Sequence, residues 1–188
     1  MKNLKTIALA FVVALSTLTV TAQTKKVDVT KSSIKWLAKK VTGEHSGTVA
    51  LKSGTLVFKK KALSGGSFTV DMTSLTATDL TGEYLGKLNG HLKSEDFFGT
   101  EKFPTSTLVF KTIASKGNDV YTVTSDLTIK GITKPVTFDI TVKGNTATTT
   151  FNVDRTKYDI KYNSKSFFDS IGDKAIYDEF ELTVNLQF

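Results

Sequence analysis

The chain has no cysteine, so its two histidines and its single arginine are the side chains to consider first for catalysis, metal binding or ligand binding. Without cysteine, disulfides, thiolate metal ligands and a cysteine nucleophile are excluded. His91 and Glu95 have the four-residue spacing that places two ligands on one side of a helix. A zinc site built from nitrogen and oxygen ligands needs three or four such groups. Two ligands are too few, so we interpret His91 as a polar residue at the edge of an apolar helix face and not as a metal ligand.

His45 and Arg155 are candidates for contact with a polar ligand group. His45 lies between Gly43 and Gly47 in a predicted bend, where it can hydrogen-bond either a head group or backbone carbonyls. Arg155 is a lone arginine in a lysine-rich chain, a pattern typical of a fixed, forked contact. A carboxylate of the fold is its favoured partner, and an anionic head group is the alternative. The sequence has neither a Gly-x-Ser-x-Gly elbow nor a phosphate-binding glycine loop, so we expect no catalysis and no cofactor.

The composition is that of one globular domain rich in strands. The 188 residues, 39% of them hydrophobic, suffice for a single core. Threonine and phenylalanine are abundant, and both favour strands. The formal charge of +7 comes from lysines scattered along the chain, which predicts no nucleic-acid partner. A transient attraction to anionic membrane surfaces and a homodimer both stay open.

Residues 1–22 have the pattern of a secretory signal peptide. Lys2 and Lys5 precede the apolar run Ile7–Leu15, which is shorter than the roughly 20 residues of a membrane span. Val20-Thr21-Ala22 then offers a cleavage site of small residues. The mature domain would be residues 23–188, located in the periplasm or secreted, and an uncleaved anchor is the alternative. Loss of two lysines lowers the formal charge from +7 to +5.

Apolar and polar residues alternate along most of residues 23–188, which is the pattern of strands with one apolar face. Turn residues separate the runs at hairpin length. We therefore predict an all-β fold, a single antiparallel barrel of about eight strands with room for side chains or one small ligand. The runs are Ile34–Ala38, Thr48–Phe58, Ser67–Met72, Thr107–Ile113, Tyr121–Lys130, Val136–Lys143, Ala147–Val153 and Phe180–Phe188.

Residues 79–98 break the alternation and have helical spacing, with Thr78 or Asp79 as the expected N-cap. Apolar residues share one stripe, at Leu80, Tyr84, Leu85, Leu88 and Leu92. Glycines recur every four residues, at Gly82, Gly86 and Gly90. Either the glycine side lets this helix pack closely on the sheet, or the helix is a marginal, mobile lid over a barrel mouth. The lid is slightly favoured.

Several motifs follow one another from Val27 to Phe188. They are Ile34-Lys35-Trp36, Gly43-Glu44-His45-Ser46-Gly47, Leu63 to Met72, Leu88 to Phe98, Phe103-Pro104, Leu127 to Val136, and Val153-Asp154-Arg155 with Tyr158. In this order they resemble the YceI-like family of secreted lipid-binding proteins. The His-Leu-Lys-Ser-x-Asp-Phe-Phe stretch and the Gly-Ile-Thr-Lys-Pro-Val turn together are quite specific.

The resemblance implies a lipocalin-like barrel with a short helix near its mouth and no catalytic activity. Its ligand would be a long-chain amphiphile, a polyisoprenoid or an isoprenoid quinone, held in an apolar tunnel for transport or storage. Burial of each CH₂ group of such a tail stabilises the complex by about 0.8 kcal/mol. The residues expected around the ligand are Trp36, His45, Phe58, Phe68, Met72, Tyr84, Leu85, Leu88, His91, Leu92, Phe97, Phe98, Phe110 and Arg155.

Two alternatives follow from the same sequence. The alternating residues up to Phe188 are also typical of an outer-membrane barrel, whose apolar faces would point outward into lipid. A metal-assisted catalytic barrel would instead use His45 or His91. A separate question concerns the aromatic residues on the inward strand faces. Each of them can either fill the barrel as core packing or line a ligand cavity.

Overall fold

The computed structural model describes residues 21–168 and 172–188, so nearly all of the predicted signal peptide lies outside the described residues. Within these residues, one α-helix, α1 (Gly82–Lys93), and two short 3-10 turns, η1 (Arg155–Tyr158) and η2 (Gly172–Lys174), accompany the strands. The strands are β1 (Ala22–Lys26), β2 (Ser33–Lys40), β3 (Gly43–Lys59), β4 (Ala62–Ala77), β5 (Thr105–Gly117), β6 (Val120–Ile129), β7 (Ile132–Lys143), β8 (Thr146–Asp154) and β9 (Ile176–Gln187).

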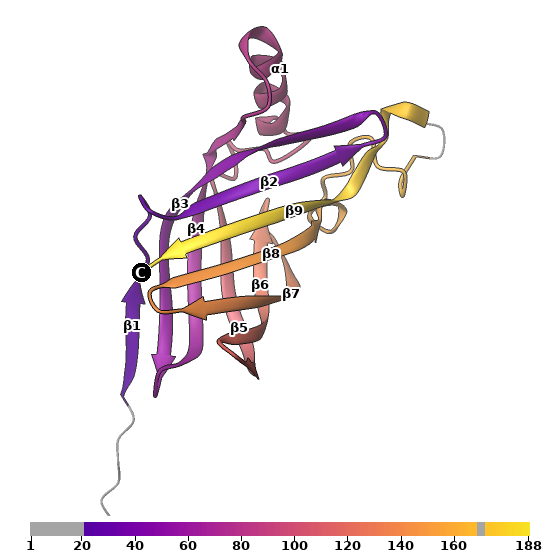
Figure 1. The fold of residues 1–188 in the computed structure, drawn as a ribbon. Coiled ribbons are helices and arrows are strands. Elements are labelled where there is room, and N and C mark those ends of the chain that lie inside the picture. Colours follow the sequence, from indigo (N-terminus) through magenta and orange to yellow (C-terminus); the bar gives the residue numbers. More distant parts are fainter. Residues whose placement is uncertain (1–20, 169–171) are drawn as a thin grey trace, which may run out of the picture.

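The strands β2 to β9 form a closed antiparallel barrel (Figure 1). Their order is β3-β2-β9-β8-β7-β6-β5-β4, and the pairing of β4 with β3 closes the ring. This confirms the predicted eight-stranded barrel. The remaining strand, β1, lies outside this ring and pairs with the second half of β3, beyond the stretch of β3 that pairs with β2. Alternation did not predict β1, because its sequence AQTKK has no apolar face.

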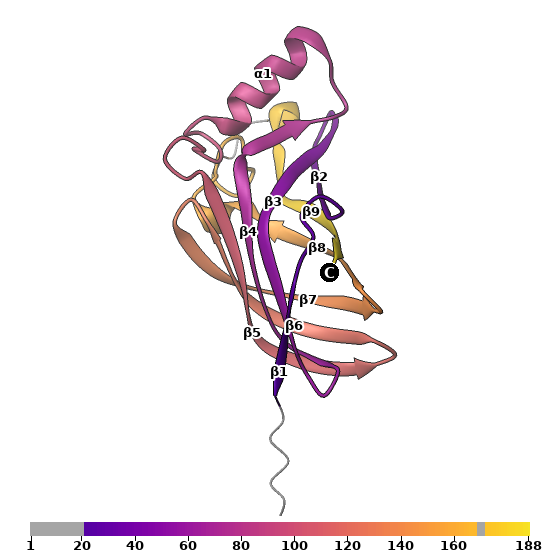
Figure 2. The same ribbon diagram turned by 90° about the vertical axis from the view of Figure 1, so that its left-hand side faces the viewer.

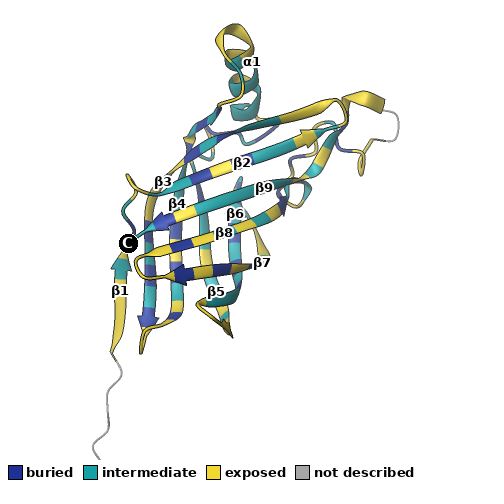
Figure 3. Ribbon diagram, viewed as in Figure 1, coloured by how far each residue is buried: buried dark blue, intermediate teal, exposed yellow. Residues whose placement is uncertain are grey.

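The apolar faces of the strands point into the barrel. In β7, Phe138, Ile140 and Val142 are buried, whereas Asp139 and Thr141 between them are exposed. The colouring by burial in Figure 3 shows such alternation along neighbouring strands. An outer-membrane barrel requires the opposite orientation, so that alternative is wrong for these strands. Among the described residues, no helix has the length and apolar character needed to cross a membrane.

The two ends of the barrel differ. The helix end carries α1, the β2–β3 and β6–β7 turns and the chain between β8 and β9; the terminal end carries β1 and the other hairpins (Figures 1 and 2). At the terminal end, Val27, Leu56 and Phe58 are buried. The rings of Phe58 and Phe188 lie 5.7 Å apart, and Lys25 lies over both. This packing fills the barrel at the terminal end.

The helix α1 lies beyond the helix end of the barrel (Figure 2). Its leucines, Leu85, Leu88 and Leu92, pack against the core. Its N-cap is Thr81, without a side-chain hydrogen bond, so the predicted caps Thr78 and Asp79 are wrong. A Cβ atom added to Gly86 or Gly90 would meet nothing within 4 Å. Close packing through the glycines is therefore also wrong, because the glycine side faces open space.

Glycines inside β3 and β4 make room for large aromatic side chains of the barrel interior. A Cβ atom at Gly47 would lie 2.5 Å from the Trp36 ring, and one at Gly66 would lie 2.7 Å from the Phe110 ring. A glycine within a strand commonly marks such a close approach. These positions therefore fix where the rings can lie.

We expect Gly47→Ala to destabilise the barrel by about 2–3 kcal/mol, because its Cβ atom would also lie 2.0 Å from the Thr76 carbonyl oxygen. Gly86→Ala is the matched control: it adds the same methyl group in open space and should stabilise α1 by up to about 1 kcal/mol. Urea unfolding monitored by circular dichroism measures both. Equal effects in the two variants would contradict this packing.

Candidate ligand-binding cavity

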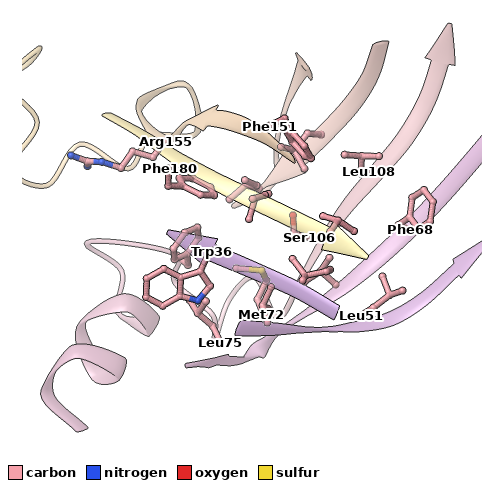
Figure 4. Close-up of a pocket in the computed structure, with 18 of the residues that line it drawn as sticks. Trp36, Leu51, Phe68, Met72, Leu75, Ser106, Leu108, Phe151, Arg155 and Phe180 are labelled. Carbon is pink, nitrogen blue, oxygen red and sulfur yellow. The ribbon is translucent and has the colours of Figure 1, made fainter. Parts of the chain in front are cut away.

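An apolar cavity of about 160 Å³ lies inside the barrel (Figure 4). Strands from every side of the barrel contribute to its wall, and so do Leu92 of α1 and the turn that follows α1. Nearly all atoms facing this space are carbon, because the inward positions carry Leu, Ile, Val and Phe. An apolar cavity of about this size stays dry and accepts apolar guests. The interior is therefore built to receive hydrocarbon.

Eight of the fourteen expected ligand contacts lie in the cavity wall. They are Trp36, Phe68, Met72, Leu92, Phe97, Phe98, Phe110 and Arg155. Their wall position follows from the strand alternation and from the turn after α1, which folds Phe97 and Phe98 back over the barrel.

The other six lie elsewhere. Phe58 fills the terminal end against Phe188. Tyr84 points outward, is 73% exposed and lies away from the cavity. Leu85 and Leu88 pack on the core from the inner side of α1 without reaching the cavity. The two histidines also lie outside the wall.

A row of phenylalanines crosses the cavity wall. Phe68 and Phe110 have ring centres 5.5 Å apart, and Phe110 and Phe138 6.1 Å apart. Phe138 stacks on Phe151 at 4.4 Å. The last contact joins β7 to β8, which pair at three positions of each strand. Side-chain stacking thus closes the wall where backbone pairing has ended.

Strand β9 supplies cavity residues that were not among the expected ligand contacts. Phe180, Leu182, Val184 and Leu186 all line the cavity. The alternating pattern shows that these four residues share one face of the strand. It does not show which residues of the other strands they face across the barrel. The pairing of Trp36 with Leu182 in the neighbouring strand settles it.

Arg155 holds the chain together at the helix end of the cavity. Its Nε, Nη1 and Nη2 atoms donate to the carbonyl oxygens of Tyr177, Ile160 and Ile176 at 3.1, 2.8 and 3.0 Å. Nη2 also lies 3.6 Å from Asp178 Oδ1. Burial lowers the pKa of Arg155, and Asp178 opposes this effect. The contact is thus a fixed one with the fold itself, and Figure 4 shows the guanidinium turned away from the other labelled side chains.

His45 connects the β2–β3 turn to the segment that leads into α1. Its Nδ1 atom lies 2.8 Å from Asp79 Oδ2, while the Ser46 backbone N–H donates to Asp79 Oδ1 at 3.2 Å. Burial raises the pKa of Asp79, but the hydrogen bonds from His45 and Ser46 outweigh it and hold this pKa below its ordinary value. His45 therefore positions the start of the helical segment.

His91 packs among aromatic rings outside the cavity. Its ring makes edge-on contacts with Phe97 at 4.8 Å and Tyr162 at 4.5 Å between ring centres. Glu95, the other half of the proposed ligand pair, forms an ion pair with Lys102 at 2.6 Å. In the described ranges, no three histidine or carboxylate side chains gather as a metal site would require.

Comparison with known proteins gives the same fold. The model of the YceI-like domain matches residues 25–188. BcnA of Burkholderia cenocepacia superposes with a TM-score of 0.62 at 22% identity, covering 85% of this chain and 98% of that one. A polyisoprenoid binding domain from Saccharophagus degradans superposes with a TM-score of 0.61 at 12% identity, covering 89% and 97%.

Sequence matches to curated relatives are shorter. A UPF0312 protein of Shewanella denitrificans is 49% identical over 46 residues, 24% of each chain. Protein YceI of Shigella flexneri is 34% identical over 92 residues, 48% of this chain and 44% of that protein. The matched segments thus span less than half the length of these relatives.

We expect Arg155→Lys to lower the free energy of unfolding by about 3 kcal/mol or more, because a lysine cannot reach three carbonyl oxygens at once and hydrogen bonds to charged groups contribute about 1.5–3 kcal/mol each. Lys157→Met, in the same 3-10 turn but largely exposed, should change it by less than about 0.5 kcal/mol. Chemical unfolding measures both. Unchanged stability of Arg155→Lys would instead favour a role in ligand binding.

Proposed function

The chain belongs to the YceI-like domain family, and we propose that it is a non-catalytic carrier or store for one long-chain amphiphilic lipid, a polyisoprenoid or an isoprenoid quinone. The observation that carries this proposal is the apolar cavity inside a closed barrel. Packing at the terminal end leaves the helix end as the side on which a lipid would enter. The likeness to the polyisoprenoid binding domain supports the same class of ligand.

The size of the cavity sets a condition on lipid binding. Pockets for ligands of drug size have volumes of roughly 300–1,000 Å³, whereas this cavity measures about 160 Å³. A long tail therefore needs side chains of the wall to move apart. Leu92, Phe97 and Phe98 are suited to this, because they come from α1 and the turn after it rather than from paired strands.

Three polar side chains of the cavity wall are held by backbone groups of the fold, which supports a binding role without catalysis. Ser106 donates from Oγ to the Thr128 carbonyl oxygen at 2.6 Å, and Thr149 donates from Oγ1 to the Asp139 carbonyl oxygen at 2.6 Å. Arg155 is held by backbone carbonyls. Each of these groups thus serves the fold. His45 and His91 lie outside the cavity, which speaks against the metal-assisted alternative.

Location and delivery are further parts of the proposal. The predicted signal peptide would send residues 23–188 to the periplasm or outside the cell. At the helix end, Val41, Tyr162, Phe167 and Phe168 are 41%, 39%, 50% and 52% exposed. We name these four side chains the rim patch.

The rim patch has the composition of a surface that touches an anionic bilayer. The Val41 backbone N–H donates to the Ala175 carbonyl oxygen at 3.1 Å, which joins the β2–β3 turn to the loop that carries the two phenylalanines. Lys161 Nζ lies 5.0 Å from the centre of the Phe167 ring. Exposed aromatic rings flanked by lysines favour the membrane interface. Contact there would bring the helix end of the barrel to its lipid source.

We expect an organic extract of the protein, purified without detergent from a bacterial envelope, to contain close to one isoprenoid lipid or quinone per barrel. Mass spectrometry identifies the lipid, and another periplasmic protein carried through the same purification controls for carry-over. A folded protein that stays free of lipid, even after incubation with prenols and quinones, would contradict the carrier function.

We also expect Phe167→Ser combined with Phe168→Ser to weaken binding to vesicles of phosphatidylglycerol and phosphatidylethanolamine by about tenfold, because partial burial of the two rings is lost. Flotation of the vesicles measures the bound fraction. Val29→Ser, which removes a 38% exposed side chain near the terminal end, is the matched control and should bind like the unchanged protein. Equal binding of all three would argue against contact through the rim patch.

A further inference from the structure

A buried hydrogen-bond donor without a partner lies in the wall of the cavity. Trp36 is 8% exposed, and its indole nitrogen Nε1 has no hydrogen-bond partner. In the described part of the chain, three other buried side-chain polar atoms lack a partner, on Ser125, Tyr158 and Asp178, and none of these residues lines the cavity. Buried N–H groups are normally paired, because an unpaired one loses its hydrogen bond to water without replacement.

The position of this indole ring is determined by the backbone beside it. Trp36 in β2 pairs with Gly47 in β3. A Cβ atom at Gly47 would lie 2.5 Å from Cζ2 and 2.6 Å from Cε2 of the indole, so this edge of the ring lies directly against β3. Cε2 is bonded to Nε1, and the direction of the N–H is therefore set by packing. A donor held in this way can select a ligand.

Apolar side chains lie on one side of the indole nitrogen, and the Thr76 carbonyl oxygen lies near the Gly47 side of the ring without forming a hydrogen bond to this N–H. Figure 4 shows the nitrogen on the side of the ring where Met72 and Leu75 lie, and both residues line the cavity. Neither side chain carries an oxygen. The described residues leave this N–H without an acceptor, and a ligand oxygen in the cavity could supply one when the wall opens.

The charge of the cavity indicates what kind of acceptor fits. Among the described residues that line the cavity, Arg155 alone is charged, and it is already held by three carbonyl oxygens and by Asp178. An anionic head group beside Trp36 would be buried without a free counter-charge, which is costly. A neutral oxygen, such as a hydroxyl or a carbonyl, accepts one hydrogen bond at no such cost.

We propose that the Trp36 indole N–H binds the neutral oxygen of the lipid head group, a hydroxyl or a quinone-type carbonyl, and so selects neutral over anionic isoprenoids. This inference rests on the proposed lipid-binding function. It places the head group next to Trp36, under the helix end, and the tail along the phenylalanine row toward Phe68.

Phytol and phytane test this inference, because they share one branched C20 skeleton, and phytol carries a hydroxyl group beside its one double bond, whereas phytane is a saturated hydrocarbon. Affinities of delipidated protein are measured by displacement of a fluorescent dye. We expect Trp36→Phe to bind phytol about five- to tenfold more weakly and phytane with unchanged affinity. Phe110→Leu, which removes apolar wall only, is the matched control and should weaken both ligands alike. Phytanic acid at pH 8 should bind the unchanged protein at least tenfold more weakly than phytol.

A spectroscopic readout separates the hydrogen bond from simple packing. Trp36 is the single tryptophan of the chain, so one indole N–H peak reports on it in a ¹H–¹⁵N correlation spectrum. We expect phytol, and not phytane, to shift the indole proton downfield. Equal losses for both ligands in Trp36→Phe, or phytanic acid bound as tightly as phytol, would overturn the inference and leave lipid binding intact. Failure of the unchanged protein to bind either C20 ligand would instead overturn the proposed function.

Discussion

Closure of the barrel is the constraint on which the rest of this structure depends. Every strand from β2 to β9 has one apolar face, and a closed sheet is the arrangement that turns all of these faces inward and leaves no free edge. Eight strands enclose more space than their small side chains fill. The positions of the large side chains determine which part of that space is filled. In this barrel they fill the terminal end and leave a cavity toward the helix end.

Glycine and aromatic positions are coupled in this division of space. Gly47 admits the Trp36 ring against β3, and Gly66 admits the Phe110 ring against β4. Without those glycines the same rings would have to point further into the barrel or leave it. The cavity is thus shaped as much by residues that have no side chain as by those that line it.

The helix end combines a rigid part with a less constrained part. Arg155 ties η1 to the start of β9 through three carbonyl oxygens, and Asp79 ties the approach to α1 to the β2–β3 turn. The helix itself has a glycine side in open space and no buried residue. Such a helix is only weakly held by packing. This contrast suits a carrier, because the wall can open for a lipid while the barrel keeps its shape.

The sequence by itself determined the class of fold and which residues share a face, and only the structure showed that the apolar faces point inward. A period of two marks which residues share a face, and the break at residues 79–98 marked the helix, which forms over Gly82–Lys93. Alternation says nothing, however, about how deep along the barrel axis a residue lies or what lies across from it. That depth is set by the register between paired strands, such as Trp36 with Gly47 in the next strand and with Leu182 in the distant strand β9. Only the tertiary structure therefore decided that Phe58 fills the barrel, that Arg155 binds carbonyl oxygens, and that the Trp36 N–H is left without a partner.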